Sequence, residues 1–495
     1  MLLTSLDPSV VAGGHDLEDA VRFGDVAFGR GDFVGAANSV AERIRGAGVL
    51  AVLATPTAPT ALAIAGCLLA GVPVVPVPAD VGQTERRHIL TDSGAQAWIG
   101  PLPDQPDGLP APELQRVCDD LLEASVPEEF KDASASLAVD WSDLETFSRP
   151  PPRGAGGCAD PEASWGHRRN NLLHDEDELF FGYYLSDAVT VPDEQGPPVP
   201  EFARRMTASS CRHDPVPAFT GVLTAMPGDG IPLGDILSDS GYSHRVPQNW
   251  ASPLRKAGAS LVQDLHPHDR GPRGTHQGAV IANGSLYCPQ TPRALLELAP
   301  LSRAATPAQA AQHDAKTAEA ARYKLGRLTS DDTDGYHRVA CPAATGKIRC
   351  LLQPPSVLLN RDRPEILQLP GHPQACCTQQ TITVPPDVLA KTAQKHDYPS
   401  AAWRRSYARR SGAERGFATA KDPASNDISR GWCRLMGLAP LMLFTAALLV
   451  ARNQRILTAW NTRQEENQRR AAKGLPPRTR RRRRKPPATA TATPP

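Results

Sequence analysis

The most constraining feature of this 495-residue chain is a set of polar side chains in the segment SYARRSGAERGFATAKD. Tyr407, Arg410, Glu414 and Lys421 follow one another with the spacing Tyr-x2-Arg-x3-Glu-x6-Lys. Because successive residues of an α-helix are rotated by about 100°, these positions fall within about 60° of one another. The spacing therefore predicts one helical face with an acid between two cations and a phenol. Such a face suits a carboxylate that holds a divalent metal beside a phosphodiester; the alternative is a solvated, charge-laced helix.

Two aspartates follow short apolar runs elsewhere in the chain. Leu137 to Val139 lead into Asp140, and Ile236 and Leu237 lead into Asp239, which Gly241 and Tyr242 follow. Each pattern predicts a buried strand whose end presents an acid. Asp143 is a rival for the first position, and the alternative for any single aspartate is a strand-end cap or a turn residue.

These three acids and the Tyr-Arg-Glu-Lys spacing resemble the Y-R-E-K signature of insertion-sequence transposases that use a D-D-E catalytic triad. Other phrases resemble an actinobacterial type of the same family: ELFFGYYLSDAVTV, VQDLHPHDRGPRGTHQGAV, KTAQKHDYPSAAWRRSYARR and DISRGWCRLMGLAPL. The resemblance runs from about residue 113 to about residue 484, which is roughly three quarters of the chain.

The resemblance implies an α/β fold: an RNase H-like mixed-sheet catalytic core with an insertion domain. It implies DNA strand cleavage and transfer with two Mg²⁺ ions held by the catalytic acids Asp140, Asp239 and Glu414. Tyr407, Arg410 and Lys421 would bind DNA phosphates near the transferred end. The implied partners are the DNA ends of the element and a second copy of the chain in a transposition complex.

The first hundred residues differ from that pattern. The stretch from Ala51 to Gly100 resembles the N-terminal part of an AMP-forming acyl-CoA synthetase. It predicts strands at 49–54 and 72–78, a helix at 59–70 and a second helix around Glu85 and His88, which is a piece of a parallel α/β layer. Synthetases of this type hold ATP with a Ser/Thr/Gly-rich loop that ends in Pro-Lys-Gly, and the sequence has no such loop. We therefore expect a truncated fragment, and an inactive relative of these ligases is the alternative function.

Charge also divides the chain. Residues 1–112 hold six Arg, no Lys and twelve acidic residues, a net charge of −6, so the remainder carries +7 within a total of +1. Opposite signs favour two origins for the two parts. The expected domains are a synthetase-like fragment at 1–99, a Pro/Gly-rich linker at 100–112, a catalytic core at 113–265 and 396–460, an insertion domain at 266–395 and a basic disordered tail at 461–495.

In this organisation the synthetase-like fragment stands where transposases usually carry a DNA-binding domain. The sequence leaves open whether the hybrid recognises DNA ends or is active. A non-catalytic DNA-binding or membrane-associated remnant is a third interpretation.

Ten cysteines occur, and the N-terminal MLLTSLDPSV lacks the basic and apolar stretches of a secretory signal. We expect a cytoplasmic, nucleoid-associated protein with reduced thiols. Five cysteines fall between Asp239 and Glu414, in phrases that resemble a zinc-bearing insertion: Cys288, Cys341, Cys350, Cys376 and Cys377. Structural zinc is thus a second expected cofactor, although no C-x2-C pair is present and buried free thiols are the alternative.

Two C-terminal segments complete the sequence. Residues 435–451 carry no charge and predict a helix packed behind Glu414 with both faces buried; a membrane-spanning helix is the alternative. From Arg452 onward there are thirteen Lys and Arg against two Glu, which predicts a DNA-binding tail centred on Arg478–Lys485.

Overall fold

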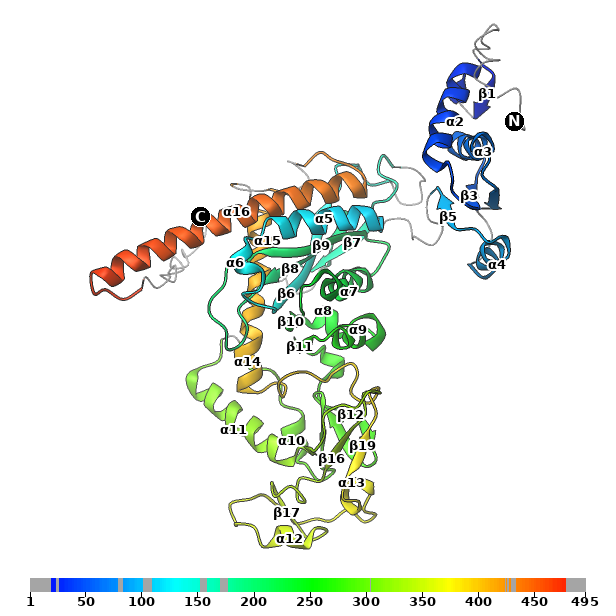
Figure 1. Ribbon diagram of the computed structural model, residues 1–495. Helices are drawn as coiled ribbons and strands as arrows, with labels where there is room; N and C mark the ends of the chain where they lie inside the picture. The colour runs from blue at the N-terminus through cyan, green and yellow to red at the C-terminus, as the bar shows by residue number, and fades with distance from the viewer. Residues whose placement is uncertain are drawn as a thin grey trace, which may run out of the picture. The chain divides into compact units, whose positions relative to one another are not determined.

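The protein is a mixed α/β protein with one curled mixed sheet and several small sheets, seen in a computed structural model (Figure 1). The structure describes residues 19–23, 26–78, 83–100, 109–151, 158–169, 177–302, 304–422, 424, 427–428 and 433–477. The chain divides into two compact units, Met1–Asp107 and Gly108–Pro495. The division falls in the Pro/Gly-rich stretch 100–112, of which residues 101–108 lie outside the described part.

The first unit is a small parallel α/β layer. Its central strand β3 (Leu50–Ala54) pairs in parallel with β4 (Val74–Pro78) and β5 (Ala97–Ile99), and α3 (Ala58–Ala70) connects β3 to β4. The other elements are β1 (Val21–Phe23), β2 (Val26–Phe28), α2 (Arg30–Ile44) and α4 (Gln83–Ser93). This is the strand–helix–strand–helix order that the sequence predicts. Pro76 is tolerated because β4 is an edge strand, where a missing N–H donor costs no hydrogen bond.

The second unit is built on a six-stranded mixed sheet. Its strands are β6 (Leu137–Glu145), β7 (Ser164–Arg169), β8 (Asp177–Thr190), β9 (Ala203–Ser210), β10 (Asp235–Ser238) and β11 (Ser260–Gln263). β8 pairs antiparallel with β6, β7 and β9, whereas β10 pairs in parallel with both β6 and β11. The carboxyl ends of β6, β10 and β11 therefore point in the same direction.

Helices cover both faces of this sheet (Figure 1). One face packs against α7 (Pro215–Ala225) and α9 (Ala251–Lys256), because alternate residues of β6 such as Leu137 and Val139 point toward them. The other face packs against α5 (Pro112–Ala124), α15 (Ser411–Ala420) and α16 (Leu438–Ala472). The short helices nearby are α6 (Glu128–Lys131), η2 (Met226–Asp229), α8 (Ser240–Ser243) and η3 (Pro247–Asn249).

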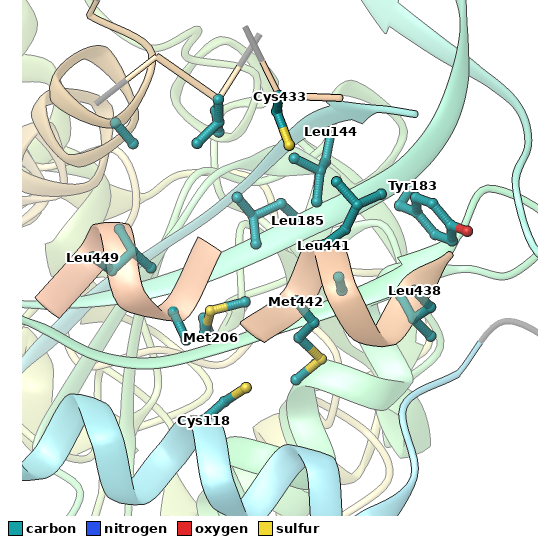
Figure 2. Close-up of a cluster of buried hydrophobic side chains, with 14 of the residues drawn as sticks. Cys118, Leu144, Tyr183, Leu185, Met206, Cys433, Leu438, Leu441, Met442 and Leu449 are labelled. Carbon is teal, nitrogen blue, oxygen red and sulfur yellow. The ribbon is translucent and has the colours of Figure 1, made fainter. Parts of the chain in front are cut away.

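The apolar part of α16 belongs to the second of these cores. Figure 2 shows Leu438, Leu441, Met442 and Leu449 of this helix beside Leu185 and Met206 of the sheet. Only one face of α16 is buried, since the Leu443 side chain on the other face is 40 % exposed. The expectation that both faces are buried is therefore wrong, because α16 lies on the outside of the sheet and contacts solvent along its length.

The helix α16 also continues without a break to Ala472. The expectation that disorder begins at residue 461 is thus wrong, because residues 461–472 are helical. Straight-chain residues and a Glu465–Arg469 pair, spaced i,i+4, favour the helix there. Across the described residues, no helix combines the length and the apolar character that crossing a membrane demands.

A long segment of small sheets separates β11 from the helices that carry the signature residues. Its three-stranded sheets are β12 (Pro272–His276), β13 (Ala279–Ala282) and β14 (Ser285–Tyr287), and β15 (Gly326–Arg327), β16 (His337–Ala340) and β19 (Ile382–Val384). The remaining elements are η4 (Pro267–Asp269), α10 (Arg293–Leu296), α11 (Pro307–Tyr323), β17 (Arg349–Cys350), α12 (Pro354–Val357), β18 (Glu365–Ile366) and α13 (Ala375–Thr378). The chain returns to the large sheet through α14 (Ala401–Tyr407) and η5 (Ala408–Arg410).

Candidate functional site

The three acids singled out in the sequence come from elements that lie side by side. Asp140 is on β6, and Asp239 follows β10 directly. These strands are parallel neighbours, with Leu237 opposite Ala138, so the two acids reach the same part of the sheet edge. Asp239 caps α8 and accepts a hydrogen bond from the Gly241 N–H at 2.9 Å. Glu414 lies in the first turn of α15, which packs against β6 and β8.

Arg410 joins the three acids. One of its terminal nitrogens lies 2.8 Å from Asp140 Oδ2 and 3.5 Å from Asp239 Oδ2. The other terminal nitrogen lies 2.7 Å from Glu414 Oε1. The Arg410 side chain is 9 % exposed, whereas the carboxylates of Asp239 and Glu414 are 36 % and 44 % exposed. The site is therefore a buried cation with acids around it that open toward solvent.

Burial and charge shift the protonation of these groups. Burial raises the pKa of Asp140 to about 6, against the charge of Arg410, and the nearby Asp239 raises it further. For Arg410 burial lowers the pKa, but the surrounding Asp140, Tyr407, Asp239 and Glu414 outweigh it, and the pKa of the guanidinium is raised. Arg410 is thus charged at any accessible pH, whereas Asp140 gains a proton as the pH falls below about 6.

Two glycines let α15 lie close to the sheet. A Cβ at Gly412 would come within 2.7 Å of Val191 Cγ1, and one at Gly416 would meet Asp187 Oδ2 at 3.4 Å. The segment GAERG therefore places one glycine on each side of Glu414 in the sequence. Small residues at this spacing bring the helix backbone against β8, and this close approach sets the position of Glu414.

An aromatic wall supports the acids from the other face of the sheet. The Tyr242 ring lies 4.6 Å from the Trp141 ring and 4.5 Å from the Trp250 ring, measured between centroids. A Cβ at Gly241 would lie 2.3 Å from Trp141 Cη2, so a larger residue there would require the Trp141 ring or the segment that follows Asp239 to shift. Packing thus explains the Gly241-Tyr242 pair that follows the second acid in the sequence.

The other signature residues take different positions. The segment is not one continuous α-helix, because the 3₁₀ turn η5 separates α14 from α15. Tyr407 stacks on Trp403 with ring centroids 4.8 Å apart, and burial raises the pKa of its hydroxyl. Lys421 caps the end of α15 and donates to Asp143 Oδ1 at 2.6 Å and to Ser142 Oγ at 2.8 Å. Asp143, the rival for the first acid, is therefore paired with Lys421, whereas Asp140 is paired with Arg410.

Two residues near the site were not found from the sequence. Asp187 lies opposite Asp140 in the β6–β8 ladder and is buried, which raises its pKa to about 6. The charge of the second residue, Arg452 of α16, favours the ionised form of Asp187. The phrase YYLSDAVTV contains Asp187, but the strand pattern alone does not distinguish it from a surface residue.

The five cysteines expected to bind zinc are buried free thiols. Cys288, Cys341 and Cys350 lie in one apolar cluster, and Cys376 and Cys377 lie in a second one that shares Leu352 with it. The Cys376 and Cys377 sulfurs are 3.7 Å apart. Within the described ranges, the one group of side chains close enough to share a metal ion is His244, His266 and Asp269, which includes no cysteine. Structural zinc on the cysteines stays a prediction.

Among the described residues, Asp140, Asp239 and Glu414 do not form such a group, and the Arg410 guanidinium contacts all three of their carboxylates. The three acids can bind divalent metals only if the guanidinium moves aside. Carboxylate oxygens are ligands that Mg²⁺ prefers, so the chemistry of the donor set fits Mg²⁺.

Comparison with known proteins identifies no relative of this chain. No protein-family model, curated protein or solved structure matches the chain.

Proposed function

We propose that the second unit is the catalytic core of a D-D-E transposase, which cleaves and joins DNA strands with two Mg²⁺ ions. The observation that carries this proposal is the meeting of Asp140, Asp239 and Glu414 around Arg410. A D-D-E nuclease needs two acids on neighbouring strands and a third on a following helix, and β6, β10 and α15 supply this distribution. The mixed sheet, with antiparallel β9, β8 and β6 followed by parallel β10 and β11, supports an RNase H-like assignment for the core.

The three carboxylates would hold the ions, which when bound would stabilise charge on the attacking and leaving oxygens. Arg410 has a separate role in this proposal. Without metal it neutralises acids that would otherwise repel one another at close range. A bound metal would require the Arg410 guanidinium to move toward the open side of the site. A planar guanidinium there is suited to bind a DNA phosphate through two parallel hydrogen bonds.

Tyr407 and Lys421 lie on the two sides of this position along the α14–α15 segment. We propose that they contact the DNA backbone beside the reacting phosphate. Lys421 would exchange its contacts with Asp143 and Ser142 for a phosphate, which its flexible side chain permits. These contacts position the DNA but do not read its sequence.

An acyl-CoA synthetase function has less support. The parallel β4-β3-β5 layer of the first unit is compatible with a piece of such an enzyme, but the sequence lacks a Pro-Lys-Gly phosphate loop. We therefore propose that the first unit is a remnant without ligase chemistry.

The direct test compares Asp140→Asn with Asp143→Asn in the full chain. Supercoiled plasmid or DNA carrying the element ends is incubated with each protein and Mg²⁺ or Mn²⁺, and nicked and joined products are counted. We expect cleavage by the unmodified chain and by Asp143→Asn, and loss of cleavage in Asp140→Asn. Cleavage that depends on Asp143 and not on Asp140 would move the first acid to Asp143. Absence of any metal-dependent cleavage, together with acyl-adenylate formation from ATP and a carboxylic acid, would favour the synthetase alternative.

A further inference from the structure

A second group of chemically active side chains lies where the chain leaves β10 and β11. His244 ends the short helix α8 that Asp239 begins, and His266 and Asp269 belong to the turn η4 that follows β11. The candidate ligand atoms of these three side chains all lie within 4.8 Å of one another. The rings of His244 and His266 have centroids 4.0 Å apart, and His268 packs edge-on against His266 at 4.8 Å.

Among these rings, His266 is shifted toward its uncharged, ligand-competent form. Burial first, and then the neighbouring His244 and His268, lower the pKa of His266. Asp269 opposes this shift, whereas Lys391 adds to it. Neutral imidazole is the form that binds metals, so at neutral pH the ring of His266 is ready to coordinate.

The hydrogen bonds of the cluster show what an ion would displace. The backbone N–H of His268 donates to His266 Nδ1 at 3.2 Å, which is a long bond that orients the ring. Lys391 donates to Asp269 Oδ1 at 2.9 Å and approaches Oδ2 at 2.8 Å. The Lys391 ammonium group is therefore the cation that neutralises the Asp269 carboxylate, and a metal ion would take its place. Binding a metal would exchange the Lys391 contact for a metal–oxygen bond.

We propose that His244, His266 and Asp269 bind a divalent transition metal ion such as Zn²⁺, Co²⁺ or Ni²⁺. Two imidazoles and one carboxylate are ligands that these ions prefer, whereas Mg²⁺ prefers a shell of oxygens. Ligand–metal distances of about 2.0–2.2 Å place the ligand atoms of such a site closer together than 4.8 Å, so binding would draw the three side chains inward by roughly 1 Å. With three protein ligands, a fourth position stays open to water or to another oxygen donor.

The site would link the segment after β10 to the segment after β11. Within the described residues, no disulfide joins these two segments. The site would fasten the η4 turn to the end of α8, and α8 begins at Asp239. An ion there would therefore stiffen the segment that carries the second acid. This inference does not depend on the catalytic role of Asp239, because metal binding is measured without DNA.

The experiment uses the full chain, stripped of metal by a chelator and then titrated with Co²⁺ while the optical spectrum is recorded. Co²⁺ bound by nitrogen and oxygen ligands gives d–d bands without the thiolate charge-transfer band that cysteine ligands produce. This difference separates the proposed site from the buried cysteines. We expect one such site in the unmodified chain, and at least about tenfold weaker binding in His244→Gln and in His266→Gln.

Two further variants sharpen the result. His372→Gln removes an exposed histidine in the same long segment and should leave Co²⁺ affinity unchanged. Lys391→Met removes the competing cation from Asp269 and should tighten binding. Thermal unfolding without metal identifies any variant that fails to fold, and Co²⁺ should raise the Tm of the unmodified chain but not of His266→Gln. Equal affinities in His244→Gln, His266→Gln and His372→Gln would overturn the proposal, and so would a spectrum dominated by thiolate bands.

Discussion

Arg410 lies 2.8 Å from Asp140, although the two residues are 270 positions apart in the sequence. This contact brings the helix that follows the long segment of small sheets onto the first long strand of the large sheet. The same guanidinium also reaches Asp239 and Glu414, so one buried cation holds together acids from three elements. The arrangement predicts both how the site contributes to stability and how it changes when metal binds.

Replacing Arg410 by methionine should destabilise the protein by about 3 kcal/mol at neutral pH. The reason is that removal of one partner of a buried ion pair leaves the other charges uncompensated. Chemical denaturation measures the change, and millimolar Mg²⁺ should restore part of the stability by taking the place of the guanidinium. Arg405→Met, at an exposed position on α14, is the matched control and should change stability by less than about 0.5 kcal/mol. Equal stability of both variants would contradict the role assigned to Arg410.

The pH dependence of stability should report Asp140. Its pKa in the folded protein is raised from an ordinary value of 3.8 to about 6. Between these values the folded state binds more protons than the unfolded state, so this group stabilises the fold below pH 4. The contribution disappears as the pH rises through 6, and its full size is at most about 3 kcal/mol, because one pKa unit corresponds to about 1.4 kcal/mol. Asp140→Asn should therefore gain stability relative to the unmodified chain as the pH is raised from 4 to 6.5. A stability difference that stays constant over this range would contradict the raised pKa.

The packing of Gly241 gives a prediction that is independent of charge. Gly241→Ala would force its Cβ against Trp141 and shift the segment that carries Asp239. We expect a decrease of about 1–3 kcal/mol in the free energy of unfolding, as is typical of overpacked sites. Gly228→Ala is the control, because a Cβ there meets no atom within 4 Å. Thermal unfolding of the two variants compares them directly, and a similar Tm for both would show that the Trp141 side chain can move aside.

Binding to DNA should depend on the basic C-terminal run. Residues 478–495 lie outside the described part of the structure, so this prediction rests on the sequence alone. Deleting them from the full chain should flatten the slope of log K against log salt concentration by about 0.9 for each DNA phosphate that the shortened chain no longer neutralises. Fluorescence anisotropy with DNA of unrelated sequences measures the slope, because phosphate contacts act on all sequences alike. An unchanged slope would reject the role of the run.

The elements that carry the acids could be predicted from the sequence, because each acid follows a local pattern. Apolar runs predict strands that end in Asp140 and Asp239. Asp239 does follow the end of β10, but the expected strand end at Asp140 is wrong, because β6 continues to Glu145 in its ladder with β8. The spacing from Arg410 to Glu414 likewise predicts a contact across one helical turn. These inferences need only the periods of strands and helices.

Other features depend on long-range contacts that no local pattern contains. The spacing places Lys421 on the same helical face as Glu414, but α15 ends at Ala420 and the lysine turns toward Asp143. The position of Arg410 between the acids depends on how α15 docks on the sheet. The His244, His266 and Asp269 group is formed by two separate connections, so its members share no sequence period. For the segment 461–472 the local information was sufficient but was outweighed by composition. Its basic character predicts disorder, whereas its individual residues favour a helix, which the structure shows.

The most direct test of the proposed function is DNA cleavage by Glu414→Gln. This change removes a charged metal ligand while it keeps the size of the side chain, and Arg410 can still donate to the amide oxygen. The matched control is Glu319→Gln on an exposed face of α11, with DNA binding measured for both proteins. We predict that Glu414→Gln binds DNA with nearly unchanged affinity and loses Mg²⁺-dependent strand cleavage, while Glu319→Gln keeps both activities. Full cleavage by Glu414→Gln would contradict the assignment of Asp140, Asp239 and Glu414 as a catalytic metal site.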